Sequence, residues 1–341
     1  MTHKKGCEFL YGFISVSPGF VMTCPDHFFG EREQLSVFHK GEIPLHEALQ
    51  QNYDLRMQAI DGLKNNKKTP CDNCTFLKNG NFPDKPSINH ISLPGRFKGQ
   101  FCNFSCIYCN VKSTKESNIR VIDVLTQISE LYPDAKLKID FCSGEFFIKP
   151  DATEVLEFCY KKGYVVNFLT NGSVYNDAIA PIAKAGNVDH INISLDSGTA
   201  KTYAHIKRVD CYNETLENIK KYSNLKIPLV LKYIMLKGIN DNKADVEGFL
   251  KIAIKYKTSV AISCNQFDVE KRLNNKTMKM VMHLIKGCND AGLNIIFYHD
   301  FFHPDDVIVI REAIGGRFRS KLKEFIKKIP LTVYIYNKIK K

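Results

Sequence analysis

The segment that organises this chain reads Gln100-Phe-Cys102-Asn-Phe-Ser-Cys106-Ile-Tyr108-Cys109-Asn110 and places three cysteines at spacings of four and three residues. Three thiolates in one short loop can bind one metal centre, and they leave one iron of a four-iron cluster without a protein ligand. An open metal position is typical of a catalytic site rather than a structural one. A zinc knuckle, or three unrelated buried cysteines, is the alternative that the triplet alone leaves open.

This Cys-x3-Cys-x2-Cys run, with Tyr108 directly before the third cysteine, resembles the signature of the radical S-adenosylmethionine (SAM) enzymes. The resemblance implies that Cys102, Cys106 and Cys109 hold a [4Fe-4S] cluster whose open iron binds the amino and carboxylate groups of SAM. One electron, from a donor such as flavodoxin or ferredoxin, then cleaves SAM to methionine and a 5′-deoxyadenosyl radical. The resemblance also implies that Tyr108 packs on the adenine.

Composition places the chain among globular proteins of the reducing cytoplasm. Of its 341 residues, 44% are apolar and 25% charged, and no apolar run is long enough to span a membrane. Its 12 cysteines indicate metal ligands or free thiols rather than disulfides. The net charge of +12 is uneven, because residues 311–341 carry ten Lys or Arg and two Glu. The basic character therefore belongs mainly to the C-terminal segment.

A second set of cysteines lies in residues 1–80: Cys7, Cys24, Cys71 and Cys74. Residues 9–16 and 20–22 are expected to pair as a hairpin, and residues 44–63 to form a helix that begins at Pro44. The Cys-x11-Gly-x4-Cys pattern, the helix and the later Cys-x2-Cys resemble the SPASM or shorter twitch extension of some radical SAM enzymes. The resemblance implies one closed auxiliary [4Fe-4S] cluster. Here, however, the extension precedes the catalytic part, and a structural zinc site is the alternative.

Beyond a linker at residues 81–87, strand-like and helix-like segments alternate. Such β-α repeats with apolar strands predict a parallel sheet covered by helices. We therefore expect an α/β protein: a partial (β/α)6 TIM-like barrel over residues 88–300, a small hairpin-helix Fe–S domain over 1–80, and a basic amphipathic segment over 301–341. The expected strands are 88–93, 136–141, 165–169, 190–195, 229–236, 259–263 and 294–298. The expected helices are 121–131, 152–160, 177–184, 215–222, 245–256 and one through 278–285.

Parallel sheets place their chemistry at the carboxyl ends of the strands. Gly144 and Glu145 follow the second of these strands and resemble the Gly-Gly-Glu motif whose backbone binds the amino group of SAM. Asn171 follows the third strand and either bonds locally or faces the site. Ser194 and Asp196 end the fourth strand, are expected to share one face by the period of two, and by resemblance bind the ribose. Alternatively, Asp196 or Ser197 caps the next helix, and both roles can coexist.

Lys232 lies inside an apolar strand, where an unpaired lysine is costly, so it is expected to face a polar site or an ion partner, for example the cofactor carboxylate. Asn240 or Asp241, just beyond that strand, is expected to cap the helix that follows. Cys264 follows the next strand and is a candidate hydrogen-atom donor to a substrate radical. Most of the other surplus cysteines are expected to be small core residues.

The sequence thus predicts an enzyme that abstracts hydrogen from a carbon of a carbohydrate, nucleotide-sugar or peptide substrate. A ribosomal-peptide maturase or epimerase is one alternative. A zinc-stabilised nucleic-acid-binding protein is an alternative of a different class, although no groove-reading or base-stacking motif supports contact with nucleic acid. The basic C-terminal segment is expected to pack as a helix, with peripheral membrane contact as the second interpretation.

Overall fold

The computed structural model describes residues 4–24, 35–39, 43–95, 97–99, 101–109, 117–265 and 272–327. The chain divides into two compact units, which are described separately below. The first comprises Met1–Ser105, Cys109–Asn192 and Glu217–Ile227, and the second comprises Cys106–Tyr108, Ile193–Leu216 and Pro228–Lys341. The cysteine loop is shared between them, because Cys102 and Cys109 belong to the first unit and Cys106 to the second.

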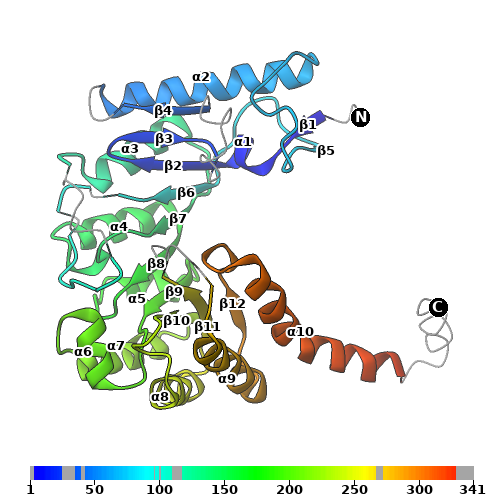
Figure 1. The fold of residues 1–341 in the computed structure, drawn as a ribbon. Helices are drawn as coiled ribbons and strands as arrows, with labels where there is room; N and C mark the ends of the chain where they lie inside the picture. The colour runs from blue at the N-terminus through cyan, green and yellow to red at the C-terminus, as the bar shows by residue number, and fades with distance from the viewer. Residues whose placement is uncertain are drawn as a thin grey trace. The chain divides into compact units, whose positions relative to one another are not determined.

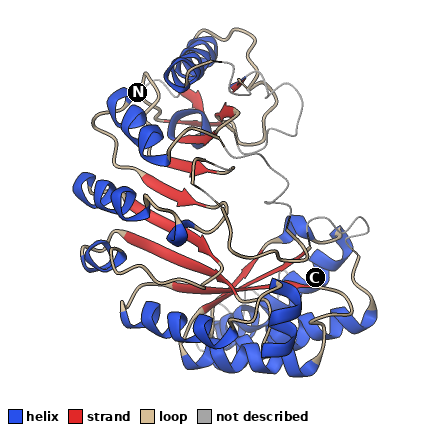
Figure 2. Cartoon of the chain, turned by 90° about the vertical axis from the view of Figure 1, so that its left-hand side faces the viewer, coloured by secondary structure: helices blue, strands red, loops and turns tan. Residues whose placement is uncertain are grey.

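The first unit is built on a mixed sheet (Figure 1). Its strand order is β8-β7-β6-β2-β3-β4. The strands β6, β7 and β8 are parallel, β2 is parallel to β6, and β3 and β4 continue antiparallel. Figure 2 shows helices running along one side of these strands. The strand bounds are Phe13–Ser17 (β2), Phe20–Met22 (β3), Ser36–Phe38 (β4), His90–Leu93 (β6), Lys138–Phe141 (β7) and Val165–Thr170 (β8).

The helices of the first unit form where apolar residues recur at the helical period. In α3 (Val121–Leu131), Val121, Val124, Leu125 and Ile128 are buried, which gives one apolar stripe. α4 ends at Gly163, whose φ of 66° is the left-handed conformation that closes a helix. The other elements of this unit are β1 (Lys4–Gly6), α1 (Glu8–Gly12), α2 (Leu45–Lys64), β5 (Lys78–Gly80), η3 (Phe146–Ile148), α4 (Ala152–Lys162) and α5 (Ile179–Lys184).

The second unit contains three parallel strands in the order β12-β11-β10. β10 (Leu229–Met235) is buried along its whole length except at Lys232, as expected of a parallel strand covered on both faces. Tyr233 packs edge-on against Phe249 of α8, so this face of β10 carries the helix. Lys232 lies on the opposite face, because side chains alternate along a strand. The remaining elements are α6 (Ala200–Lys207), α8 (Lys243–Lys255), β11 (Ser259–Cys264), α9 (Asn275–Ala291), β12 (Ile295–Phe297), η4 (His299–Phe301) and α10 (Pro304–Lys327).

The chain passes between the units within β9 (Val188–Ser194) and α7 (Tyr212–Asn224). Parallel strands alternating with helices therefore confirm the predicted mixed α/β class, and the predicted strands and helices beyond residue 88 are found with bounds shifted by a few residues. The helix α6 was not predicted, because its eight residues carry few apolar positions. Its N-cap is Thr199, not Asp196, since the Thr199 side chain accepts from the Thr202 backbone N–H.

The N-terminal segment differs from the expectation in two respects. Residues 13–22 form the predicted hairpin, but α1 (Glu8–Gly12) is a helix where a strand was expected. The expected boundary at residues 81–87 does not separate two sheets either. Phe13, Ile14 and Ser15 of β2 pair in parallel with His90, Ile91 and Ser92 of β6, so both sides of the linker lie in one sheet and one unit. Strand pairing of this kind is a long-range contact that local sequence patterns do not encode.

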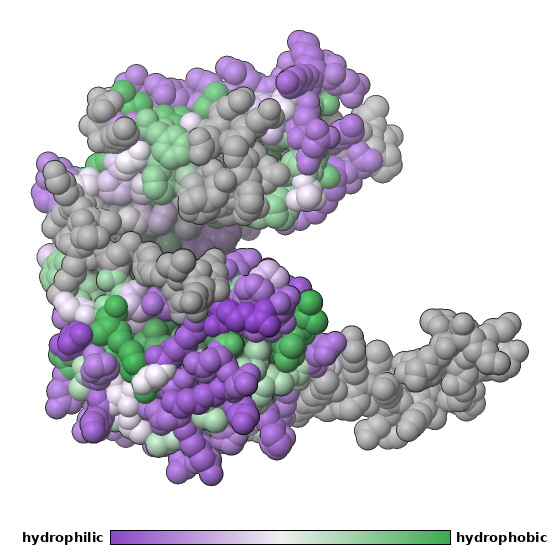
Figure 3. All heavy atoms as spheres, viewed as in Figure 1, coloured by the Kyte–Doolittle hydropathy of each residue, from purple (hydrophilic) through white to green (hydrophobic). Residues whose placement is uncertain are grey.

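Helix α2 covers this part of the sheet. It begins at Leu45 with Pro44 as its N-cap, one residue later than expected. Its outer side is largely hydrophilic (Figure 3), while Ala48, Leu49, Ala59 and Ile60 are buried beneath it. Across the described part of the chain, no helix is both long and apolar enough to cross a membrane.

Candidate functional site

In the first unit, a buried carboxylate joins the loop after β7 to the end of β8. Glu145 is fully buried. Its Oε2 accepts from the Asn171 backbone N–H at 2.6 Å, and the Thr170 hydroxyl lies 2.8 Å from both carboxylate oxygens. The Phe147 backbone N–H donates to Oε1 at 3.2 Å. The side chain of Glu145 is therefore engaged within the protein, and it positions the two loops rather than facing a ligand.

Burial raises the pKa of Glu145 to about 7, while the hydrogen bonds from Asn171, Thr170 and Phe147 oppose that rise. The backbone of this loop makes a different contact. The Glu145 backbone N–H donates to the carbonyl of Phe101 at 2.9 Å, so the Gly-Glu turn is bonded directly to the cysteine loop. Gly144 has a φ of 66°, a conformation that favours glycine because glycine has no Cβ.

Cys102 is linked to the end of β8 by an amide. The Asn171 side-chain nitrogen lies 3.6 Å from Cys102 Sγ and 2.9 Å from Asn103 Oδ1. The Asn171 side-chain oxygen accepts from the Ser173 backbone N–H at 2.8 Å. Asn171 thus bonds locally and also reaches the cysteine loop, which were the two alternatives left open by the sequence. Burial raises the pKa of the Cys102 thiol, whereas the amide of Asn171 lowers it.

In the second unit, Asp196 lies at the centre of a closed network. Its Oδ2 accepts from the Tyr108 hydroxyl at 2.6 Å and from the Lys207 amine at 2.5 Å, and its Oδ1 accepts from the Ile234 backbone N–H at 2.8 Å. Asp196 and Lys207 are both fully buried. The Asn240 amide donates to the Asp196 carbonyl at 2.7 Å. Both carboxylate oxygens are therefore engaged by protein groups.

The expected shared face of Ser194 and Asp196 is wrong. β9 ends at Ser194, the Leu195 backbone N–H turns back to the carbonyl of Ile193 at 3.0 Å, and Asp196 takes a φ of 59°. The period of two applies only while the strand continues. Ser194 is half-buried at the end of the strand, whereas the Asp196 side chain is fully enclosed.

Lys232 and Ser263 place two hydrogen-bond donors on one face of the second unit. Ile234 pairs with Ser263 in the parallel register, and Lys232 shares the face of Ile234. The Lys232 amine lies 5.3 Å from the centre of the Tyr298 ring, and burial lowers its pKa. No described residue gives this amine an ion pair or hydrogen bond. The buried Ser263 hydroxyl has no hydrogen-bond partner among the described residues either.

The remaining predicted residues of the second unit have simpler surroundings. Cys264 is buried at the end of β11, opposite Met235. Neither Asn240 nor Asp241 caps α8, because Asn242 does so by accepting from the Asp245 backbone N–H. Asp241 instead accepts from Lys276 and Thr277 of α9.

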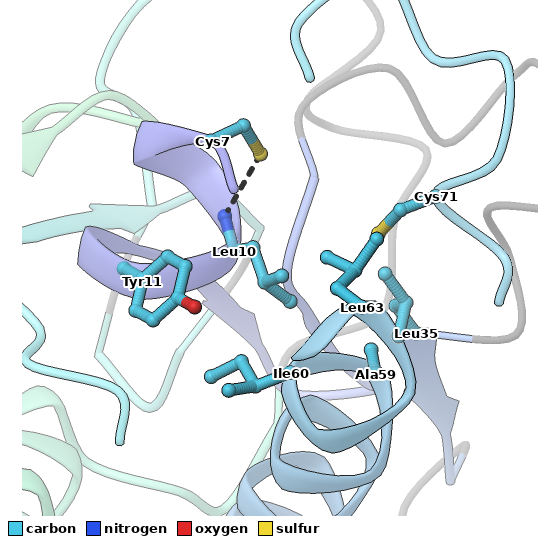
Figure 4. Close-up of a cluster of buried hydrophobic side chains, with 8 residues drawn as sticks. All are labelled: Cys7, Leu10, Tyr11, Leu35, Ala59, Ile60, Leu63 and Cys71. Atoms are coloured by element: carbon cyan, nitrogen blue, oxygen red, sulfur yellow. Dashed lines mark hydrogen bonds between the residues drawn. The ribbon is translucent and has the colours of Figure 1, made fainter. Parts of the chain in front are cut away.

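The N-terminal cysteines gather in the first unit around the end of α2. Cys7 and Cys71 are buried in one cluster with Leu63 (Figure 4). Cys24 packs against this cluster. Cys7 Sγ accepts from the Leu10 backbone N–H at 3.4 Å. Burial raises the pKa of Cys71 to about 12, and its other three neighbouring thiols add to that rise: Cys7, Cys24 and Cys74. The predicted thiols therefore lie in one region of the first unit, although Cys7, Cys24 and the Cys71–Cys74 pair are far apart in sequence.

A fully buried arginine lies beside these thiols, and the sequence reasoning missed it. Arg56 of α2 donates to the carbonyls of Phe9, Leu10 and Phe13, and to the side chain of Asn52, at 2.5–3.2 Å. Within the described residues, no carboxylate pairs with its guanidinium. The signal available from sequence was an arginine on the apolar stripe of a predicted helix.

The donor chemistry of both cysteine sets fits a thiophilic metal centre such as iron–sulfur. The side chains do not converge on one ion position: in the described ranges, no group of three or more His, Cys, Asp or Glu lies close enough to hold a metal ion. Cys109 is exposed, and Cys102 and Cys106 are partly exposed, so the thiols of the central loop are accessible.

Comparison with known proteins identifies the central part of the chain. Residues 98–253 match the family model of the radical SAM superfamily, a segment that begins just before Cys102 and includes Gly144, Ser194 and Lys232. The chain carries a radical SAM domain. This confirms the expected enzyme class.

Curated relatives match the radical SAM domain at low identity. A GTP 3′,8-cyclase of Desulforamulus reducens is 27% identical over 150 residues, which cover 42% of this chain and 46% of the relative. A probable GTP 3′,8-cyclase of Pyrococcus horikoshii is 30% identical over 152 residues, with the same two coverages. The chain thus spans about half the length of these relatives. The solved structure of Streptococcus suis SuiB bound to precursor peptide SuiA matches with a TM-score of 0.50 at 12% identity, over 76% of this chain and 55% of that one, which shows a similar fold.

Proposed function

We propose that this chain reductively cleaves SAM and uses the resulting radical on a phosphate-bearing substrate of the nucleotide or nucleotide-sugar class. The observation that carries the proposal is the cysteine loop of the radical SAM domain, bonded through the Phe101 carbonyl to the backbone of the Gly144-Glu145 turn at 2.9 Å. When bound, a [4Fe-4S] cluster and SAM would supply a 5′-deoxyadenosyl radical that abstracts hydrogen from a substrate carbon.

The chain's own residues bind and orient these groups. Cys102, Cys106 and Cys109 hold the cluster, and the open backbone at Gly144 receives the SAM amino group. Glu145, engaged through its carboxylate with Thr170 and Asn171, keeps that turn in place.

The second unit provides the other proposed contacts. Lys232 and Ser263 offer donors without acceptors on one sheet face, which suits the SAM carboxylate. Ser194 is the proposed contact to the ribose, since the carboxylate of Asp196 is engaged elsewhere. Tyr108 presents its ring rather than its hydroxyl to the adenine. Cys264 is the proposed hydrogen-atom donor.

The substrate class is supported by the relatives, whose names specify a nucleotide. These relatives match only the radical SAM domain, so the assignment rests on that domain. A peptide substrate, as in a maturase or epimerase, is the competing proposal. The likeness to the peptide-bound SuiB structure bears on fold and not on substrate, because the two chains are only 12% identical.

We further propose that Cys7, Cys24, Cys71 and Cys74 bind a second metal–thiolate centre, a [4Fe-4S] cluster in preference to zinc. Arg56 supports this proposal. A fully buried guanidinium without a carboxylate is costly unless an anion lies near it. Burial lowers the pKa of Arg56 to about 10, and the negative charges of Tyr132, Cys24 and Cys7 oppose that fall. A four-thiolate metal centre is anionic and would supply the missing negative charge.

The decisive experiment is anaerobic reconstitution followed by addition of dithionite and SAM, with 5′-deoxyadenosine as the readout. Cys106→Ala should lose the product. An iron content of about eight per chain would support two four-iron clusters, and about four would remove the second. Stimulation of 5′-deoxyadenosine formation by GTP or nucleotide sugars, and not by peptides, would support the substrate class. Intact cluster without product, and no effect of Cys106→Ala, would refute the proposal.

A further inference from the structure

The hydroxyl of Tyr108 is bonded to two buried residues of the second unit. It donates to Asp196 Oδ2 at 2.6 Å and accepts from the Lys207 amine at 3.0 Å. A tyrosine hydroxyl has one proton to donate, so none is left for a cluster sulfur or a ligand. Tyr108 lies between two predicted cluster ligands, Cys106 and Cys109. Its engagement therefore restrains the backbone that carries them.

The helix α6 holds the same segment at a second point. The Ile107 backbone N–H donates to the carbonyl of Ile206 at 3.0 Å, one residue before Lys207. Ile107 and Tyr108 also pack against Ile206, Ile234 and Leu236. The last turn of α6 thus contacts the cysteine loop through the backbone, through apolar packing and through the Lys207 amine.

The ion pair between Lys207 and Asp196 is costly on its own account. Both side chains are 0% exposed, and desolvating two charges can exceed their mutual attraction. The best-attested use of such a pair is to specify one geometry among several. Here the geometry it specifies includes Asp196 in its left-handed conformation and the Tyr108 ring, whose centre lies 5.4 Å from the Lys207 amine.

We propose that Lys207 is a positioning residue for the cluster: with Asp196 it locks Tyr108, and so holds residues 106–108 in the conformation that cluster binding requires. This inference rests on the proposed function, because it presupposes a cluster on the central cysteines. It assigns to Lys207 and Asp196 a role in the loop rather than in contact with SAM or the substrate.

The test compares Lys207→Met, Tyr108→Phe and the double variant in the reconstituted protein. The readouts are the rate of iron loss to a chelator and the electron paramagnetic resonance signal of the reduced cluster that responds to SAM. Each single variant should lose that cluster at least about tenfold faster. The double variant should be no worse than the singles, because both act through one network. Lys207→Arg should restore much of the retention, since arginine can bond both partners.

Lys149→Met is the matched control, because Lys149 is also buried and paired, with Asp151 at 3.3 Å, but lies in the first unit. It should lower the melting temperature without accelerating cluster loss. Wild-type retention in Lys207→Met, equal acceleration in Lys149→Met, or additive effects in the double variant would overturn the inference. Failure of the proposed function would look different, since the wild-type protein itself would then form no 5′-deoxyadenosine. If Lys207→Met does not fold, the rates of cluster loss in Tyr108→Phe and Lys207→Arg test the inference in its place.

Discussion

The Asn171 backbone N–H lies 2.6 Å from Glu145 Oε2, so the loop that ends β8 is bonded to a carboxylate in the loop that ends β7. The amide of the same asparagine reaches Cys102 Sγ at 3.6 Å. One residue therefore connects the acidic turn to a predicted cluster ligand.

Glu145 should make the stability of the protein depend on pH. Burial raises its pKa from the usual 4.5 to about 7, so the folded state holds this proton more tightly than the unfolded state. The contribution of the group is then fully present below pH 4.5 and is lost as the pH rises through about 7. Glu145→Gln cannot ionise and should lack this fall in the free energy of unfolding. A pKa shift of this size corresponds to a fall of about 3 kcal/mol. Anaerobic denaturant titrations of both proteins between pH 5 and about 8 measure it. Parallel curves would contradict the expectation.

Gly144→Ala should weaken SAM binding without removing the cluster. An alanine at a left-handed φ costs about 1–2 kcal/mol, and its Cβ would cover the backbone proposed to receive the amino group. Gly163→Ala is the control, because Gly163 has the same φ of 66° and open space around its Cα. Both variants should lose similar stability, but only Gly144→Ala should raise the KM for SAM. An equal KM in the two variants would remove Gly144 from the proposed site.

Lys232→Met should raise the KM for SAM about tenfold or more, because the amine is the proposed partner of the SAM carboxylate and a charge-assisted hydrogen bond contributes about 1.5–3 kcal/mol. The iron content should stay unchanged. Lys255→Met is the matched control, since Lys255 also lies over a tyrosine ring, with its amine 5.0 Å from the Tyr256 ring centre, but on an exposed face. If Lys232→Met leaves the KM for SAM unchanged and raises the KM for a phosphate-bearing substrate instead, Lys232 binds the substrate and not SAM.

Arg56→Met should reduce metal at the N-terminal thiols while the central cluster stays in place. The substitution removes the buried positive charge and leaves the carbonyls of Phe9, Leu10 and Phe13 without their donor. Iron should fall from about eight to about four per chain if the second centre is a four-iron cluster. Arg56→Lys, which retains a charge, should keep more metal than Arg56→Met at equal loss of melting temperature. Equal metal in both variants would mean that Arg56 acts only by bonding the carbonyls.

Local patterns were sufficient for most of the elements in the radical SAM domain. The apolar spacing of residues 121–131 predicts α3 with its observed bounds, since an amphipathic helix is encoded by residues three and four apart. The apolar run around Lys232 likewise predicts β10. The elements that failed are short or depend on distant partners. Residues 9–12 were expected to form a strand, but they lie in a helix whose carbonyls accept hydrogen bonds from Arg56, a residue more than 40 positions away.

The site residues show the same distinction between local and long-range information. Glu145 and Asp196 follow strands, as expected of site residues, yet their carboxylates are bonded within the protein. Strand-end position could be read from the sequence, whereas the partners Thr170 and Lys207 could not. A hydrogen-bond network depends on which loops fold next to one another, and spacing along the chain does not encode this.

The sequence by itself determined the cysteine loop Cys102–Cys109, because three predicted ligands within eight residues are held near one another by the length of the chain alone. It also determined the alternation of strands and helices, which follows from local periodicity. Only the tertiary structure decided that Asp196 and Lys207 enclose the Tyr108 hydroxyl, and that Arg56 lies among the N-terminal thiols. These are contacts between distant residues, and their geometry exists only after the strands and helices have packed.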